Sequence, residues 1–243
     1  FFSAISIAQD VGFSNILDAV YPDKNNLKFY KNYSIDSPKN TIYNINLVVK
    51  SELNSVIKVD YKSDSFNKII FSEVLDVPVE QNTGLDSRTE RFKGNINPYV
   101  IRRAPFRIFE IIKPIKSSML ISKSNFSLIN VKIPIDKNLN LDKHQIDFTI
   151  HINDQKFSLK LKIHIHDIII PELEKSNFFY TNWFNLSKME EYHQLERWST
   201  DWYIMLDKYA KLMAYGRQNC VKIPGELIYI ENDEIFLNEE RMM

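Results

Sequence analysis

Over the first two thirds of the chain, apolar and polar residues alternate in short segments with the two-residue period that is typical of β-strands. Turn-forming groups such as Asp36 to Asn40 and Asp136 to Asn138 separate these segments, and Asn153 to Gln155 predicts a tight hairpin loop. Short strands at regular spacing favour an antiparallel β-sandwich over a parallel sheet, and we expect that fold over residues 1–170. The predicted strands cover residues 27–33, 41–50, 56–61, 69–79, 100–112, 127–135, 145–152 and 156–166.

A polar segment from Gln81 to Asn97 breaks this pattern and shows no apolar periodicity. Long loops inside compact domains are usually functional or mobile. The arginines in and after this segment have two interpretations. They could form a fork-shaped donor set for a carboxylate, a sulfate or sugar hydroxyls, or they could pair with neighbouring acidic residues. We favour ion pairs, because structural ion pairs are common. The four arginines are Arg88, Arg91, Arg102 and Arg103.

Two histidines raise the question of a metal site. His164 and His166 are two residues apart in a predicted strand and therefore share a face, with Asp167 following them. Two imidazoles and a carboxylate are able to bind zinc or another divalent ion. Lys160 and Lys162 continue the same face, however, which is typical of an ordinary solvated strand. The sequence therefore predicts no metal site here.

The polar segment from Pro171 to Asn177 is the best candidate for a domain boundary. After it, the aromatic run from Phe178 to Tyr180 predicts a short buried strand, and residues 186–197 predict a helix. Ser199 is a candidate N-cap for a second amphipathic helix, and a further strand is expected over Cys220 to Ile223. Strand, helix and strand form a βαβ unit, which needs more sheet to cover its faces than this segment supplies.

Charge and composition exclude several classes of protein. Lys+Arg and Asp+Glu number 31 each, so no basic surface for nucleic acid or an anionic membrane is expected. None of the five glycines lies in a phosphate-binding motif, and we expect no cofactor. The single cysteine, Cys220, excludes an internal disulfide framework and multi-cysteine metal sites. No segment approaches the roughly 18 consecutive apolar residues that a membrane span requires.

The first residues bear on localisation. Residues 1–8 are apolar, and Ser6-Ile7-Ala8 resembles the small-residue pattern before a signal cleavage site. An equally good interpretation is a first strand whose true start lies upstream. Together they favour an extracytoplasmic location only slightly.

The order of these features resembles glycoside hydrolase family 123 and its uncharacterised relatives, which are similar to β-N-acetylgalactosaminidases. The resemblance rests on the sandwich with its proline-rich exit, the strand ending Tyr180-Thr181-Asn182-Trp183-Phe184, the Trp- and Tyr-rich helix, and the segment from Met213 to Asn219. It implies an N-terminal β-sandwich followed by a (β/α)8 barrel. Such a barrel needs about 250 residues, of which only about 70 follow the boundary. We therefore expect an N-terminal fragment with a sandwich over residues 1–170 and the first barrel elements over 171–243.

Within such a barrel, the carboxyl end of a strand faces the active site. The resemblance therefore implies that Asn182, Trp183 and Phe184 contact the substrate. The alternative is that Trp183 and Phe184 fill the junction between the two domains. Arg217 and Asn219 precede the second strand and are expected to be structural.

Catalysis in this family, as the resemblance implies it, uses an adjacent Asp–Glu pair at the end of a later strand. The Glu is the general acid, and the Asp orients the 2-acetamido group of the substrate, which attacks the anomeric carbon. Asp233-Glu234 lies in a polar turn, and Glu190-Glu191 lies on a helix where neighbours point about 100° apart. We expect the catalytic pair to lie beyond Met243.

The leading hypothesis is a fragment of a glycoside hydrolase that acts on N-acetylhexosamine-containing glycans by substrate-assisted retaining hydrolysis in its intact form. Its expected partner is the glycan substrate, and the fragment alone is expected to be inactive. The alternative hypothesis is a non-catalytic carbohydrate-binding or structural β-sandwich module. The oligomeric state and the exact sugar are not predicted.

Overall fold

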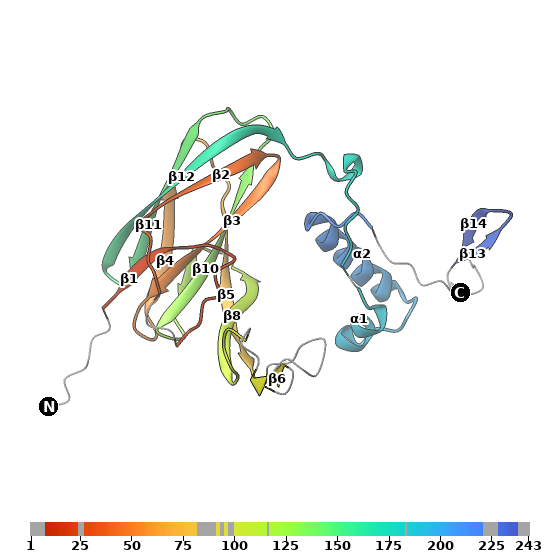
Figure 1. Cartoon of the computed structure of the whole chain (residues 1–243), viewed down its shortest axis with the longest axis horizontal. Coiled ribbons are helices and arrows are strands. Elements are labelled where there is room, and N and C mark those ends of the chain that lie inside the picture. Colours follow the sequence, from red (N-terminus) through yellow and green to blue (C-terminus); the bar gives the residue numbers. More distant parts are fainter. Residues whose placement is uncertain are drawn as a thin grey trace. The chain divides into compact units, whose positions relative to one another are not determined.

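The computed structural model describes residues 8–23, 27–81, 91–92, 95–96, 100–115, 117–182, 184–220 and 228–237 (Figure 1). The chain divides into two compact units, Phe1–Ile170 and Pro171–Met243, which we call the β unit and the helical unit. The protein is mainly β, with antiparallel and mixed sheets.

The β unit contains two five-stranded sheets. The first has the order β1-β3-β10-β5-β8, and the second has the order β2-β12-β11-β4-β9. Among the described residues every strand pair is antiparallel except β2 with β12, which is parallel. The bounds are β1 (Asp10–Ser14), β2 (Asn32–Lys39), β3 (Thr41–Lys50), β4 (Val56–Lys62), β5 (Ile70–Val79), β6 (Arg91–Phe92), β7 (Asn95–Ile96), β8 (Phe106–Pro114), β9 (Met119–Ile121), β10 (Phe126–Ile135), β11 (Lys143–Ile152) and β12 (Gln155–Ile169).

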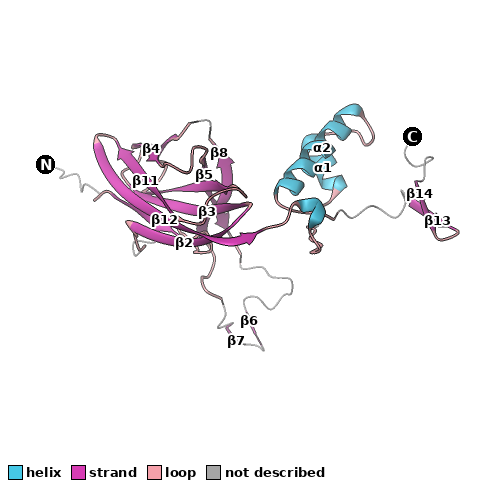
Figure 2. Ribbon diagram, turned by 90° about the horizontal axis from the view of Figure 1, so that it is seen from above, coloured by secondary structure: helices cyan, strands magenta, loops and turns pink. Residues whose placement is uncertain are grey.

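The two sheets form two layers, as expected of a β-sandwich (Figure 2). Alternate side chains of both sheets form one apolar core. The ring of Phe148 from β11 contacts that of Phe13 from β1 edge-on, with 5.9 Å between centroids. Because successive strand residues point to opposite faces, every second residue of a strand is buried. In β11 and β12 the buried residues are Ile146, Phe148, Ile150, Ile152, Leu159, Leu161, Ile163 and Ile165.

The outer face of the first sheet carries a second, smaller apolar cluster. Val48, Val74 and Leu128 of this sheet pack there with Val20 and Phe126, and Phe29 adds a partly buried ring. Strand β3 is therefore covered on both faces, which explains why its residues 45–49 are all buried and do not alternate.

Most predicted strands are present, with bounds that differ by a few residues. The segment 41–50 forms β3, and Asn153 turns the chain between β11 and β12 with a φ of 51°. The turn predicted over Asp36–Asn40 is wrong, because β2 continues to Lys39 and the chain turns at Asn40 with a φ of 57°. Pairing with the distant strand β12 overrides the local turn preference.

Two strands begin later than predicted, and two short strands were not predicted. The strand predicted over 27–33 begins only at Asn32, and that predicted over 100–112 begins only at Phe106. The short strands β1 and β9 were not predicted. Each has five residues or fewer, too few to show a clear alternation.

The helical unit contains the 3-10 turn η1 (Leu173–Lys175), α1 (Leu186–His193), α2 (Thr200–Tyr215) and the antiparallel hairpin of β13 (Ile228–Glu231) with β14 (Glu234–Leu237). The side chain of Asn185 caps α1 by accepting from the N–H of Lys188. Ser199 caps α2 as predicted, with its Oγ 3.2 Å from the amide nitrogen of Trp202. The first helix ends before the predicted residue 197, because Gln194 adopts a left-handed conformation with φ 54°. Among the described residues no helix is long and apolar enough to cross a membrane.

The buried strand predicted over Phe178–Tyr180 is wrong. The segment is irregular, and the side chains of Phe178 and Phe179 are 75% and 77% exposed. A continuous aromatic run resembles a buried strand, yet here the side chain of Asn219 holds the backbone. Its Oδ1 accepts from the N–H of Tyr180 at 2.8 Å, and its Nδ2 donates to the carbonyl of Phe178 at 2.9 Å. The second predicted strand, 220–223, lies outside the described residues apart from Cys220.

We expect Gly12→Ala to lower the free energy of unfolding of the β unit by about 1–3 kcal/mol. A Cβ at Gly12 would lie 2.5 Å from the Cα of Phe29 and 2.7 Å from the backbone nitrogen of Tyr30, so the two segments must move apart. Urea unfolding followed by circular dichroism measures the loss. The control is Gly216→Ala, whose Cβ first meets the carbonyl oxygen of Met213 at 3.4 Å and should change the value by less than about 0.5 kcal/mol. Equal effects of the two substitutions would contradict the close approach.

Candidate functional site

The structure brings Asn182 and Phe184 to one hollow of the helical unit. Both residues lie in the segment that enters α1, and both line a hollow of about 250 Å³. Trp183, predicted to act with them, lies outside the described residues. The remaining lining residues come from the end of α2 and the segment after it: Leu212, Met213, Gly216 and Gln218.

Phe184 also lines a larger, open cleft of about 780 Å³. Its ring packs against that of Tyr209, with 5.1 Å between centroids. We call this the aromatic cleft, and its full lining is Phe184, Asn185, Lys188, Met189, Glu191, Tyr192 and Tyr209. Mostly apolar walls with a few polar groups are typical of a small-molecule or cofactor site.

Hydrogen bonding and ring contacts fix the wall of the aromatic cleft. The Nε2 of His193 lies 2.9 Å from the hydroxyl of Tyr209, joining the end of α1 to the middle of α2. The ring of Tyr192 meets that of His193 edge-on at 5.0 Å. The orientation of Tyr209 is therefore set by its contacts with His193 and Phe184.

Polar groups of the smaller hollow are partly engaged. The Oδ1 of Asn182 accepts from the hydroxyl of Tyr180 at 3.0 Å. Gln218, which sequence reasoning missed, is buried and its Nε2 donates to the carbonyl of Cys220 at 3.0 Å and to the hydroxyl of Thr181 at 3.3 Å. Its Oε1 is buried and has no partner among the described residues. The sequence carries no signal for this role, because nothing in the local pattern distinguishes Gln218 from an exposed residue after a helix.

Glu190 is held in a structural ion pair. Arg197 donates to both carboxylate oxygens, at 2.7 Å and 3.0 Å, and the indole N–H of the buried Trp202 adds a third hydrogen bond at 2.8 Å. The hydrogen bonds from Arg197 lower the pKa of Glu190 below its ordinary value of 4.5. Glu190 therefore stays ionised and has no proton to give as a general acid. Glu191 pairs instead with Lys188 on the exposed side of α1.

The other adjacent acidic pair, Asp233 with Glu234, lies at a hairpin turn. Asn232 and Asp233 both have positive φ, 50° and 64°, and Glu234 opens β14 opposite Glu231. Neither side chain lines the described hollow or the aromatic cleft. This position agrees with the expected solvated turn.

Arg102 is engaged with other groups of the β unit. Its guanidinium binds the carboxylate of Asp23 through both terminal nitrogens, lowering the pKa of that carboxyl. It also lies over the rings of Tyr21 and Phe106, 4.5 Å and 5.1 Å from their centroids. These contacts favour the ion-pair interpretation for this arginine. The predicted partner Arg88 and the side chain of Arg91 lie outside the described residues.

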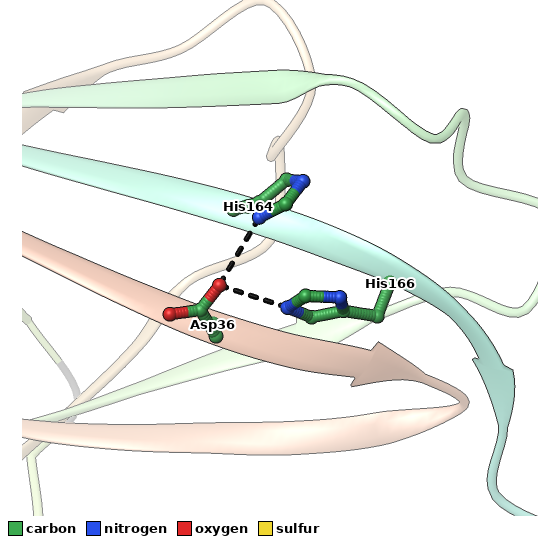
Figure 3. A group of neighbouring side chains, drawn as sticks. All are labelled: Asp36, His164 and His166. Atoms are coloured by element: carbon green, nitrogen blue, oxygen red, sulfur yellow. Dashed lines mark hydrogen bonds and ion pairs between the residues drawn. The ribbon is translucent and has the colours of Figure 1, made fainter.

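The two histidines of β12 have a carboxylate partner that the sequence did not indicate (Figure 3). Parallel pairing places Asp36 of β2 beside His164, and the same oxygen of Asp36 also meets His166. Asp167, the carboxylate that the sequence places next to these histidines, does not contact them. Its carboxylate lies 3.7 Å from the amine of Lys39 instead, since it points to the other face of β12.

Comparison with solved structures finds a fold-level likeness. The chain is similar to a family 123 glycoside hydrolase from Clostridium perfringens, whose structure was analysed for glycolipid glycan hydrolysis, with a TM-score of 0.67 and 10% identity. The likeness covers 85% of this chain and 36% of the hydrolase, so the chain spans about a third of that protein. At this identity it indicates a shared fold.

Two further solved structures match much less well. A PapD-like domain of human CEP192 has a TM-score of 0.27 at 11% identity, over 66% of this chain and 87% of that domain. A DUF4466 family protein from Parabacteroides merdae has a TM-score of 0.29 at 10% identity, over 63% of this chain and 44% of that protein. No family model and no curated protein matches the sequence.

We expect Glu190→Gln to lower the free energy of unfolding of the helical unit by about 1–2 kcal/mol at about pH 7. The folded pKa of Glu190 is lowered, so its contribution is complete above the ordinary value of 4.5 and is lost as the pH falls through the folded pKa. The difference from wild type should therefore shrink toward about pH 3. Urea unfolding followed by tryptophan fluorescence measures it, because Trp202 contacts Glu190.

The control is Glu191→Gln, which removes an exposed pair and should cost less than about 0.5 kcal/mol at any pH. A pH-independent loss in Glu190→Gln would contradict the role of the ionised carboxylate.

Proposed function

We propose that this chain is part of a glycan-processing protein of the glycoside hydrolase type, in which a β-sandwich over residues 1–170 precedes a (β/α)8 barrel that begins in residues 171–243. The observation that carries the proposal is the likeness to the family 123 glycoside hydrolase, which extends over 85% of this chain. A likeness confined to the β unit would support only a generic sandwich, since such sheets occur in many unrelated proteins.

Exposed apolar side chains of the helical unit support the barrel. Phe178, Phe179 and Leu212 are 75%, 77% and 65% exposed, although large apolar groups on a soluble domain usually find cover. Additional barrel elements packing on the helical unit would bury such groups.

The proposed ligand is an N-acetylhexosamine-containing glycan bound at the aromatic cleft. Phe184 and Tyr209 offer ring faces to the apolar side of a pyranose, and the exposed Tyr192 offers a third ring. Lys188 and Glu191 lie at the rim as hydrogen-bonding groups for hydroxyls or the acetamido group. Asn182 precedes Phe184 by two residues and lines the smaller hollow, to which Phe184 also contributes.

The proposed reaction of the whole protein is substrate-assisted retaining hydrolysis, with the catalytic acid outside this chain. Among the described residues, Glu190 is hydrogen-bonded to Arg197 and Trp202, and the Asp233-Glu234 pair lines neither the aromatic cleft nor the smaller hollow. The residues of this chain would therefore bind and orient the sugar without transferring a proton.

A second candidate function is a carbohydrate-binding module without catalysis. The same aromatic cleft supports it, because sugar binding there needs no carboxyl pair. The two functions differ only in whether the longer protein hydrolyses the glycan that this cleft binds.

We expect the chain alone to show no hydrolysis of 4-nitrophenyl N-acetyl-β-galactosaminide above the buffer rate, since the general acid is proposed to lie elsewhere. Release of nitrophenolate, followed by absorbance, measures it. A heat-denatured sample of the same protein serves as the baseline. Turnover that disappears in a Glu234→Gln variant would overturn the assignment of Glu234 to a solvated turn.

We expect N-acetylgalactosamine to perturb the NMR signals of the helical unit, and Phe184→Ala to weaken its binding by about tenfold through loss of the stacking ring. The control is Tyr229→Ala, an exposed ring of the β13–β14 hairpin that stacks on Phe236 and does not line the aromatic cleft. Unchanged affinity in Phe184→Ala, or equal losses in both variants, would contradict sugar binding at the aromatic cleft.

A further inference from the structure

Two imidazoles converge on one carboxylate oxygen at the surface of the β unit. The Oδ1 of Asp36 lies 3.1 Å from the Nδ1 of His164 and 2.8 Å from the Nε2 of His166 (Figure 3). The two imidazole rings are neighbours, with 4.5 Å between their centroids. The three residues come from two strands whose backbones are fixed side by side by parallel pairing.

We propose that Asp36, His164 and His166 form a binding site for a divalent transition metal ion, with Zn²⁺ as the best-suited ion. Their ligand atoms all lie within 4.8 Å of one another. Two histidine nitrogens with one carboxylate oxygen are a common zinc donor set, with ligand distances of about 2.0–2.2 Å. Mg²⁺ and Ca²⁺ prefer oxygen ligands and fit this set poorly.

The exposure of the cluster allows the ligands to close around an ion. The side chains of Asp36, His164 and His166 are 71%, 50% and 44% exposed, so modest rotations need no rearrangement of the core. Three protein ligands leave a fourth position open to water. A metal-bound imidazole is neutral, so in each ring the nitrogen that faces Asp36 would present its lone pair to the ion while the other ring nitrogen carries the proton.

The charge of the cluster suits a cation, although its surroundings are mixed. Hydrogen bonds from His166 and then from His164 lower the pKa of Asp36, so the carboxylate is ionised at neutral pH. Lys143 of β11 pairs opposite His164, and Lys162 lies two residues before it on the same face. The Lys39–Asp167 ion pair lies on the other face of β12. Burial raises the pKa of Tyr43, and the charges of Tyr33 and then Asp36 raise it further. The nearby lysines oppose cation binding and set an upper limit on affinity.

A second His–Asp contact on the same sheet shows what distinguishes this cluster. The Nε2 of His151 lies 3.1 Å from the Oδ2 of Asp60, which also accepts from Lys58 at 2.9 Å. Here one imidazole and one ammonium share a carboxylate, and an ammonium cannot ligate a metal. The His151–Asp60 contact therefore lacks a second metal-ligating partner, and it serves as a matched control.

The test is titration of the tag-free full chain with Zn²⁺ against a chromophoric chelator at about pH 7.5, because at lower pH protons compete with a metal for histidine nitrogens. We expect one saturable ion per chain. His164→Gln, His166→Gln and Asp36→Asn should each weaken binding by about tenfold or more. His151→Gln and Cys220→Ser should leave binding unchanged, and Mg²⁺ should not compete.

A second readout is thermal unfolding followed by circular dichroism. Zn²⁺ should raise the midpoint of the wild-type β unit and leave that of His164→Gln unchanged, because the ion ties β2 to β12 only when the site is intact. No saturable binding, or binding that survives the double variant His164→Gln with His166→Gln, would overturn the proposal. Failure here leaves the proposed glycan function untouched, since the aromatic cleft belongs to the other unit.

Discussion

Strands β3 and β10 pair antiparallel over ten residues at the centre of their sheet. Strand β1 pairs with β3, β5 pairs with β10, and β8 extends the sheet beyond β5. The register sets Leu47 opposite Ile129 on the core face, and Asn46 opposite Asn130 on the other. The amide of Asn130 donates to that of Asn46 at 3.1 Å, a buried polar contact that a shifted register would break. A slip of one residue in either strand would move its core-facing side chains, such as Leu47 or Ile129, to the opposite face of the sheet. The second sheet packs on the face that this register creates.

Sequence reasoning recovered the parts of the fold that local patterns determine. Strands β11 and β12 alternate strictly because one face is buried and the other solvated, and their hairpin turn at Asn153 carries its own signal. Strand β2 was mistaken in part for a turn, because its conformation depends on a partner more than a hundred residues away. The buried strand predicted over Phe178–Tyr180 is absent for the converse reason. Its composition favours burial, but the backbone is held by Asn219 and the rings remain exposed.

The candidate site was predictable to the same extent. Asn182 and Phe184 do lie together, because they are neighbours in sequence just before a helix that the sequence predicts. Gln218 joins them only through the chain reversal after α2, which no local pattern specifies. Asp36 reaches the histidines only through parallel pairing of distant strands, and the nearer Asp167 was chosen in its place. Local periodicity carries no information about contacts between residues that are far apart in the sequence.

The parallel pairing of β2 with β12 also constrains the order in which the protein can be completed during synthesis. Strand β12 lies between β2 and β11, and 128 residues separate Asp36 from His164. A chain that leaves the ribosome N-terminus first presents β2 long before its neighbour exists. Until about residue 170 has emerged, the early strands keep unpaired edges that invite pairing with other chains. We therefore expect aggregation of the nascent chain to depend on the time between the synthesis of β2 and that of β12.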